Sequence, residues 1–191
     1  MDDKDKANPD PDGHAVLLLP GWLDSGPEHW QSRWEALHGH RRVEQDDWLW
    51  PRRGDWMARL DEVLIETPGR AVLVAHSLGC QLVAAWAAHS NHVHRVAAAL
   101  LVAPPDTERE DMPPNLFNWR PIVRERLPFA SLAVLSNDDP FCSMPRALKM
   151  AADWDAEVVE IGARGHINGE SGLGDWPAGL ALLHGLAGRA L

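Results

Sequence analysis

The sequence contains no tyrosine and only two cysteines, Cys80 and Cys142, among its 191 residues. Two cysteines cannot build the disulfide framework that stabilises small secreted domains, although one bridge between them stays open. The cytosol is the default compartment for such a chain, so we expect a cytoplasmic protein. Tryptophan, in contrast, occurs 10 times, and we expect most of these rings in the core or along surface grooves.

Positive charge is also scarce. Lys and Arg number 18 against 28 Asp and Glu, which gives a net charge of -10 at pH 7. Nucleic acids and anionic membranes bind concentrated positive charge, so neither is expected as the main partner. No apolar run approaches the roughly 20 residues that a membrane-spanning helix needs. Residues 1–13 lack the basic start and apolar stretch of a secretory signal, and we interpret them as a flexible acidic tail.

Hydrophobic residues make up 45% of the chain, which is typical of a folded protein. The length fits one domain, which we expect over residues 14–191. Apolar runs alternate with helical patterns along this domain. We expect strands at 15–19, 43–48, 71–74, 96–102, 131–135 and 157–161, and helices at 28–38, 55–67, 81–88, 146–153 and 177–186. This alternation predicts a parallel sheet with helices on both faces, an α/β fold.

The segment 106–128 is too long for a simple connection. It carries charged residues, two adjacent prolines and the apolar residues Leu116, Phe117 and Trp119. Two interpretations have about equal weight. The segment forms a small lid beside a site, or it is a surface excursion with one packed helix.

Ser77 ends the apolar run that begins at Ala71, and a helix is expected shortly after it. A sharp turn from strand to helix at a serine is typical of a nucleophile elbow, which lifts the hydroxyl clear of the sheet. The first N–H groups of the helix point at the same place. By itself the pattern Ser-x-Gly is common and carries little weight.

Candidate partners of Ser77 follow later strands. In open parallel sheets ligands bind at the carboxyl ends of the strands. Asp138-Asp139 follows the fifth expected strand, and Gly165-His166 follows the sixth. The chain order of serine, acid and histidine is the order used by one large fold family. His166 is the candidate base, because it lies on a Gly-flanked loop that can reach the serine.

Other chemically active side chains fit a site less well. The spacing of His89, His92 and His94 suggests metal binding, but no acid or cysteine completes the set, and a solvated loop is the better interpretation. We therefore expect no metal. His76 is next to Ser77, and we expect its side chain to point elsewhere. We interpret Cys80 as a buried, inert thiol.

Several short motifs follow one another along the chain. They are PGW at 20–22, SGPEHWQ at 25–31, HSLG at 76–79, SNDDP at 136–140, GHIN at 165–168, SG at 171–172 and WP at 176–177. With these motifs the chain resembles the α/β-hydrolases, and more narrowly the small serine hydrolases of the retinoblastoma-binding protein nine and YdeN type. The resemblance covers nearly all of the chain after the tail. Ala75 departs from it, because the wider fold prefers glycine there, but alanine is still small enough for a close approach of strand and helix.

The resemblance implies a three-layer α/β/α sandwich with about six mostly parallel strands and little or no cap. It implies Asp139, rather than Asp138, as the acid that orients the histidine, and Pro140 would hold Asp139 in an extended conformation. Asp138 would brace the loop. The N–H of Leu78, the residue after the nucleophile, would form the oxyanion hole. The N–H of Trp22 matches the second donor of the family.

Together these residues predict a serine hydrolase with the triad Ser77, His166 and Asp139. The expected substrate is a small carboxylic ester, or alternatively a thioester or amide, cleaved through an acyl-serine intermediate without a cofactor. Two other functions stay open: a protein-interaction module on a hydrolase fold, and lactonase or haloperoxidase-like chemistry. The sequence assigns no substrate-binding residues.

Overall fold

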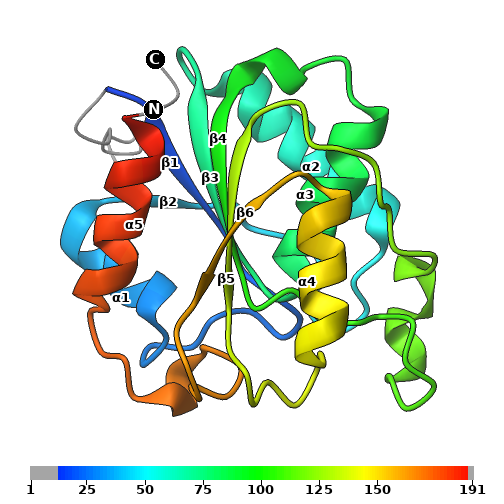
Figure 1. The fold of residues 1–191 in the computed structure, drawn as a ribbon. Coiled ribbons are helices and arrows are strands. Elements are labelled where there is room, and N and C mark those ends of the chain that lie inside the picture. Colours follow the sequence, from blue (N-terminus) through cyan, green and yellow to red (C-terminus); the bar gives the residue numbers. More distant parts are fainter. Residues whose placement is uncertain (1–12, 189–191) are drawn as a thin grey trace.

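The computed structural model describes residues 13–188 and shows an open, six-stranded parallel sheet (Figure 1). The strands lie in the order β2-β1-β3-β4-β5-β6, and each neighbouring pair is parallel. Residues 1–12 of the expected tail lie outside the described residues.

The elements alternate along the chain. The strands are β1 (Ala15–Leu19), β2 (Arg41–Arg42), β3 (Ala71–His76), β4 (Val96–Val102), β5 (Ala130–Leu135) and β6 (Glu157–Glu160). The α-helices are α1 (Trp30–His38), α2 (Arg53–Glu66), α3 (Leu78–His89), α4 (Met144–Asp153) and α5 (Pro177–Ala187). Short 3-10 helices lie at η2 (Val93–Arg95), η3 (Pro114–Trp119) and η4 (Gly169–Ser171).

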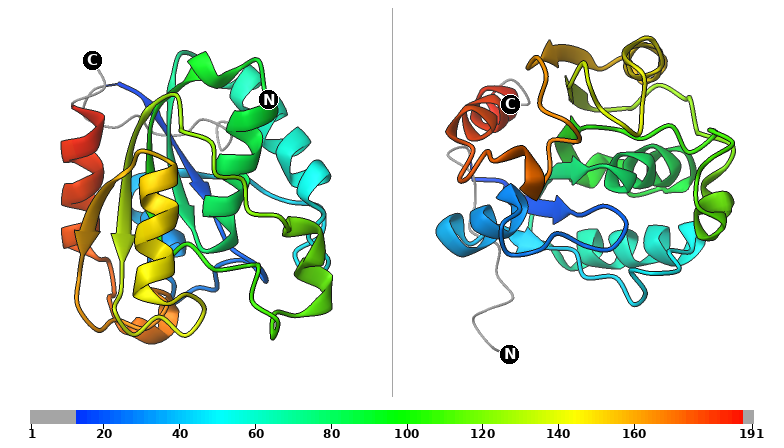
Figure 2. Two further views of the ribbon diagram at one scale, coloured as in Figure 1. Left: turned by 45° about the vertical axis from the view of Figure 1, so that its right-hand side comes forward. Right: turned by 90° about the horizontal axis from the view of Figure 1, so that it is seen from below.

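Helices cover both faces of the sheet (Figure 2). Successive side chains of a strand point to opposite faces, and β1 shows this directly. Leu17 and Leu19 pack in the core formed with α2, α3 and α4, whereas Val16 and Leu18 pack in the core formed with α1 and α5. The predicted three-layer α/β/α architecture is therefore confirmed. No helix within residues 13–188 has both the length and the apolar composition to cross a membrane.

Most of the tryptophans lie in these two cores, as expected. Four of them pack on the face of α2, α3 and α4, and three pack on the face of α1 and α5. These seven tryptophans are all buried, Trp176 slightly less than the others: Trp30, Trp34, Trp56, Trp86, Trp119, Trp154 and Trp176.

The expected strand at 43–48 is wrong, because β2 consists of Arg41 and Arg42 only. One further bond, from the N–H of Val43 to the carbonyl of Leu18 (2.9 Å), extends its contact with β1. The chain then turns away, and the carboxylate of Asp47 accepts two main-chain N–H groups of that turn. The apolar residues that suggested a strand therefore belong to a loop.

Four helices also begin at other residues than expected: α1 at 30 instead of 28, α2 at 53 instead of 55, α3 at 78 instead of 81 and α4 at 144 instead of 146. Helix α1 begins at Trp30, because the ring of His29 accepts the N–H of Gln31 (3.1 Å) and caps the first turn. Helix α3 begins at Leu78, directly after Ser77. The turn from strand to helix is thus sharper than the sequence pattern required.

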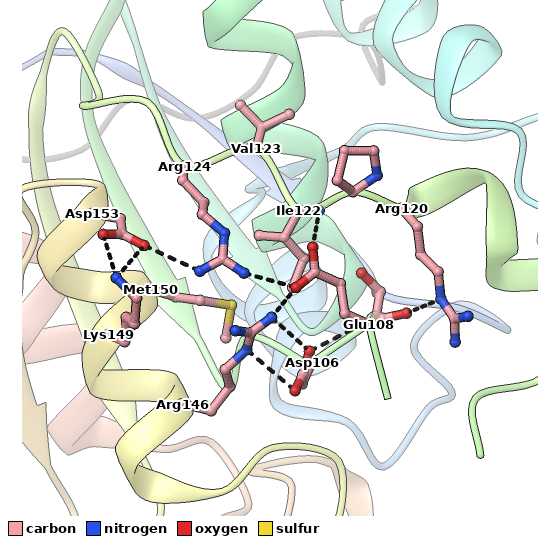
Figure 3. A network of polar contacts seen from close by, with 12 residues as sticks. Asp106, Glu108, Arg120, Ile122, Val123, Arg124, Arg146, Lys149, Met150 and Asp153 are labelled. Carbon is pink, nitrogen blue, oxygen red and sulfur yellow. Dashed lines mark hydrogen bonds and ion pairs between the residues drawn. The ribbon is translucent and has the colours of Figure 1, made fainter. Parts of the chain in front are cut away.

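Segment 106–128 is fastened to α4 by charged side chains (Figure 3). Arg146 of α4 pairs with Asp106 (3.2 Å) and with Glu108. Arg124 of the segment pairs with Glu108 (2.7 Å) and with Asp153 of α4 (3.4 Å). Burial alone would raise the pKa of Glu108, but a main-chain N–H and the two guanidinium groups lower it below its ordinary value. Glu108 therefore stays ionised between two cations and ties the segment down.

The apolar residues of segment 106–128 fill the same core as α2, α3 and α4. Leu116 and Trp119 of η3 are 2% and 1% exposed, and the indole of Trp119 donates to the carbonyl of Pro51 (2.8 Å). This matches the interpretation as a packed surface excursion, although the packed helix is a 3-10 helix.

Gly79 lies where the start of α3 meets the end of β1. A Cβ on this glycine would be 2.3 Å from the carbonyl oxygen of Leu19 and 3.0 Å from that of Pro20. Both contacts are main-chain atoms that cannot rotate away. Only glycine permits this approach of helix and strand.

We expect Gly79→Ala to lower the free energy of unfolding by about 2 kcal/mol, because overpacking forces the backbone apart. The matched control is Gly185→Ala, on the exposed side of α5, where a Cβ would meet no atom within 4 Å. Gly185→Ala should raise the free energy of unfolding by up to about 1 kcal/mol, because alanine favours the helical conformation more than glycine does. Urea denaturation followed by circular dichroism measures both values. Equal effects of the two substitutions would contradict the close contact.

Candidate active site

Ser77 forms the turn between β3 and α3, with φ of 53° and ψ of -122°. A positive φ is costly for a residue with a Cβ, so neighbouring contacts have to hold the turn. The N–H of Ser77 donates to the carbonyl of Val102 (2.9 Å). Gly21 lies so close that a Cβ there would be 2.7 Å from the Cβ of Ser77. The hydroxyl is thus held at the carboxyl ends of β1, β3 and β4.

Three side chains from separate loops meet at this edge of the sheet. The Nε2 atom of His166 is 2.8 Å from the Oγ of Ser77. The Nδ1 atom of the same ring is 2.9 Å and 3.0 Å from the two carboxylate oxygens of Asp139. The side chains of His166 and Asp139 are only 9% and 4% exposed. A proton on Nδ1, facing the carboxylate, leaves Nε2 free to accept the serine O–H.

The two adjacent aspartates contact different groups. Asp139 faces His166 and also accepts the N–H of Phe141 (2.9 Å). Asp138 accepts the hydroxyl of Ser136 and the N–H of Gly165, both at 2.7 Å. These two donors hold the pKa of Asp138 below its ordinary value. Asp138 therefore braces the loop that carries His166, as the sequence suggested.

The two main-chain N–H groups expected to form an oxyanion hole belong to Leu78, directly after Ser77, and to Trp22, directly after Gly21. Leu78 is the first residue of α3, and Trp22 follows the glycine that touches Ser77. Among residues 13–188 no main-chain hydrogen bond in a turn or loop uses either N–H. The indole of Trp22 donates to the carbonyl of Leu49 (3.1 Å) and fixes the position of this turn.

A cavity of about 650 Å³ opens beside Ser77. Most of its walls are apolar. They come from the turn after β1 (residues 21–29), from the start of α3 and from the loop after β5. Segment 106–128 adds Met112, Pro113 and Leu116. The excursion therefore also forms a wall of the site, so that part of the lid interpretation holds.

Two buried histidines at this cavity were not recognised from the sequence. The ring of His76 does not point elsewhere but faces His166, and its Nε2–H donates to the main-chain carbonyl of His166 (2.9 Å). His29 packs edge-on against His76, with 4.6 Å between ring centroids. Burial lowers the pKa of His29 to about 3, with help from Arg42 and His166, and burial also lowers the pKa of His76. No local sequence pattern reveals such burial.

The remaining candidate groups lie in other surroundings. Cys80 and Cys142 are both buried and unpaired. Burial raises the pKa of Cys142 to about 12 and raises the pKa of Cys80 as well, so both thiols are inert at neutral pH. His92 is 2.9 Å from the carboxylate of Asp61. Within residues 13–188 no group of three or more His, Cys, Asp or Glu side chains is arranged to hold a metal ion.

An open parallel sheet with a serine at a strand-to-helix turn, and with acid and histidine after later strands, is the architecture of the α/β-hydrolases. The chain belongs to the serine hydrolase family, whose model matches residues 16–185.

Solved structures agree with this assignment. A YdeN-like hydrolase from Pectobacterium atrosepticum is 30% identical, with a TM-score of 0.82 over 93% of this chain and 92% of that chain. The ydeN gene product from B. subtilis is 18% identical, with a TM-score of 0.66 over 93% and 98% of the chains. A carboxylesterase from Bacillus cereus is 17% identical, with a TM-score of 0.60 over 97% and 92%. The last two show a shared fold. Among curated proteins no significant match is found.

The buried histidines make stability depend on pH. In the unfolded chain a histidine takes up a proton below its ordinary pKa of about 6.5, whereas folded His29 stays neutral down to about pH 3. The unfolded state thus binds more protons in this window, and the free energy of unfolding falls as the pH decreases. We expect His29→Gln to reduce that slope by up to about 1.4 kcal/mol per pH unit.

Urea denaturation at several pH values between about 6 and 4 measures this slope. His184→Gln, on the exposed side of α5, is the control and should leave the slope unchanged. An identical slope in the native protein and the His29→Gln variant would show that His29 is protonated in the folded state.

Proposed function

We propose that this serine hydrolase cleaves small carboxylic esters through an acyl-serine intermediate on Ser77. The observation that carries the proposal is the 2.8 Å contact between the Oγ of Ser77 and the Nε2 of His166. A serine hydroxyl becomes a useful nucleophile only when a neighbouring base takes its proton. The carboxylate of Asp139 on the opposite ring nitrogen supports this role, because it orients the ring and stabilises its charged form.

The reaction proceeds in two halves. His166 takes the proton of Ser77 as Oγ bonds to the ester carbonyl carbon, and the carbonyl electron pair moves onto its oxygen. The intermediate collapses, and the alcohol leaves with the proton from His166. A water molecule, deprotonated by His166, then attacks the acyl carbon. The second intermediate collapses, the carboxylic acid leaves, and His166 returns the proton to the Oγ of Ser77. Asp139 keeps its own charge throughout and faces the imidazolium each time it forms.

In this proposal the N–H groups of Trp22 and Leu78 donate hydrogen bonds to the negatively charged oxygen of each tetrahedral intermediate. Both residues line the cavity beside Ser77, and neither N–H is used by a main-chain turn or loop bond within residues 13–188, which supports this assignment. The partial positive charge at the start of α3 acts in the same direction. One such donor typically contributes about 3 kcal/mol to the transition state.

The cavity beside Ser77 favours an apolar acyl or alcohol group. Its volume of about 650 Å³ falls within the roughly 300–1,000 Å³ that small-molecule sites occupy. Trp22, Leu78, Met112 and Phe141 supply apolar walls. Thioesters and amides use the same groups and are the alternative substrates.

We further propose that residues 14–191 act as one domain in the cytoplasm. A single sheet with one hydrophobic core on each face supports the first statement. The two unpaired, buried cysteines support the second, because reducing compartments keep thiols free.

Ser77→Ala should abolish labelling by a fluorophosphonate probe, and kcat/KM for an aryl ester should fall by roughly 10⁴-fold or more. Gel fluorescence and an absorbance assay measure these effects. Ser90→Ala, after the opposite end of α3, is the control and should keep full labelling. Persistent labelling of the Ser77→Ala variant would refute the nucleophile.

Asp139→Asn should lower kcat by roughly 10³- to 10⁴-fold, because the amide no longer stabilises the imidazolium. Asp138→Asn should lower it by less than about 10-fold, since Asp138 contacts only the loop. Steady-state kinetics with an aryl ester give both ratios. A larger loss in Asp138→Asn would move the orienting acid to Asp138.

A further inference from the structure

A second cavity has a volume of about 890 Å³. Segment 106–128 lies between this cavity and the one beside Ser77 and contributes residues to both. Pro113 and Leu116 line the cavity beside Ser77, whereas Pro114, Asn115 and Asn118 line the second one. The loop between β2 and α2 and the first turn of α2 form the rest of its lining. Nothing in the hydrolytic mechanism uses this second cavity.

The walls of the second cavity are held by hydrogen bonds between loops far apart in the sequence. The side-chain amide of Asn115 donates to the carbonyl of Leu49 (2.6 Å), and that of Asn118 donates to the carbonyl of Pro51 (3.1 Å). The Oδ1 atom of Asn118 accepts the N–H of Arg53 (2.7 Å). The cavity is therefore formed before any ligand enters it, which reduces the entropy lost on binding.

Gln45 gives the clearest sign of a ligand. It is only 8% exposed, and it lines the cavity. Within residues 13–188 no hydrogen bond involves its side-chain amide. The amide is not one of the fully buried groups that lack a partner, so its polar atoms face the open space of the cavity, where a ligand can reach them. An amide offers two donors and one acceptor, so a ligand here would need hydroxyl-like groups that both accept and donate.

Trp50 supplies an aromatic surface at the same cavity. Its side chain is 59% exposed, in contrast to the buried tryptophans of the two cores. The carboxylate of Asp47 accepts the N–H of Trp50 (2.8 Å) and of Leu49 (2.9 Å), which fixes the turn that carries the ring. An exposed indole of this kind gains from a ligand that covers its apolar face.

The charges around the cavity are nearly balanced. Three acids, Asp46, Asp47 and Asp55, stand against Arg52 and Arg53. A strongly anionic or cationic ligand would meet like charges, and an aliphatic chain would leave Gln45 without a partner. A neutral ring with several hydroxyl groups satisfies all these groups. Its C–H face can cover an indole, while its hydroxyls both donate and accept.

We propose that the second cavity is a binding site for a neutral, hydroxyl-rich ring, that is, a sugar unit. Trp50 stacks on the ring and Gln45 bonds its hydroxyl groups. The carboxylates and guanidinium groups at the rim take the remaining hydroxyls. Binding at this site does not use Ser77, so a failure of the proposed esterase activity would not affect the sugar-binding proposal.

The test is a titration of the full chain with glucose, galactose, mannose, xylose, N-acetylglucosamine and their β-1,4-linked disaccharides. Saturation-transfer NMR and tryptophan fluorescence report binding. At least one sugar should bind saturably at up to about 50 mM. Trp50→Ala and Gln45→Leu should each weaken the Kd by about 10-fold or more. Near-ultraviolet circular dichroism verifies that both variants are folded.

Two controls locate the bound sugar. Ser77→Ala should leave the Kd unchanged, since the cavity lies across the wall from the serine. Leu37→Ala, which removes an equally exposed apolar side chain on α1, should also leave it unchanged. The proposal is overturned when no sugar of the panel binds saturably, or when both cavity variants bind as well as the native chain. Loss of binding in Ser77→Ala alone would place the sugar in the other cavity and equally overturn it.

Discussion

The close contact between the start of α3 and the end of β1 is the constraint on which the site depends. Gly79 lets the helix touch the carbonyl of Leu19, and Gly21 lets the first turn touch Ser77. The helix can therefore begin directly after the serine, and the strained backbone of Ser77 is enclosed from both sides. The proposed oxyanion-hole donors, the N–H groups of Trp22 and Leu78, belong to the residues that follow Gly21 and Ser77 in these two turns. A bulkier residue at either glycine would separate these parts.

The fold and the three central side chains were accessible from the sequence for a topological reason. In a parallel sheet all strands end at the same edge, so the polar residues after β3, β5 and β6 had to lie near one another. The structure brings Ser77, Asp139 and His166 within hydrogen-bonding distance. Asp138 and Asp139 are adjacent, yet they contact different groups: Asp138 binds Ser136 and Gly165, whereas Asp139 binds His166.

Other parts of the molecule could not be read from local patterns. The position of β2 depends on pairing with β1, and only two of its residues pair. The burial of His29 and His76 depends on packing between α1, β3 and the loop after β6, which no single stretch reveals. The position of segment 106–128 depends on the ion pairs that Asp106 and Glu108 form with Arg146 of α4, which lies much later in the chain. Each of these features arises from contacts between distant residues, where periodicity carries no information.

The spacing of the site residues along the chain also has a consequence for biosynthesis. Ser77 and His166 are separated by 89 positions, and His166 follows the last strand. A ribosome synthesises the chain from the N-terminus at about 5–20 residues per second. Ser77 is therefore made several seconds before His166. During those seconds the nascent chain carries an unactivated hydroxyl. Under the proposed mechanism, reactivity appears only when the sheet is complete, so unfinished or truncated chains would lack an active nucleophile.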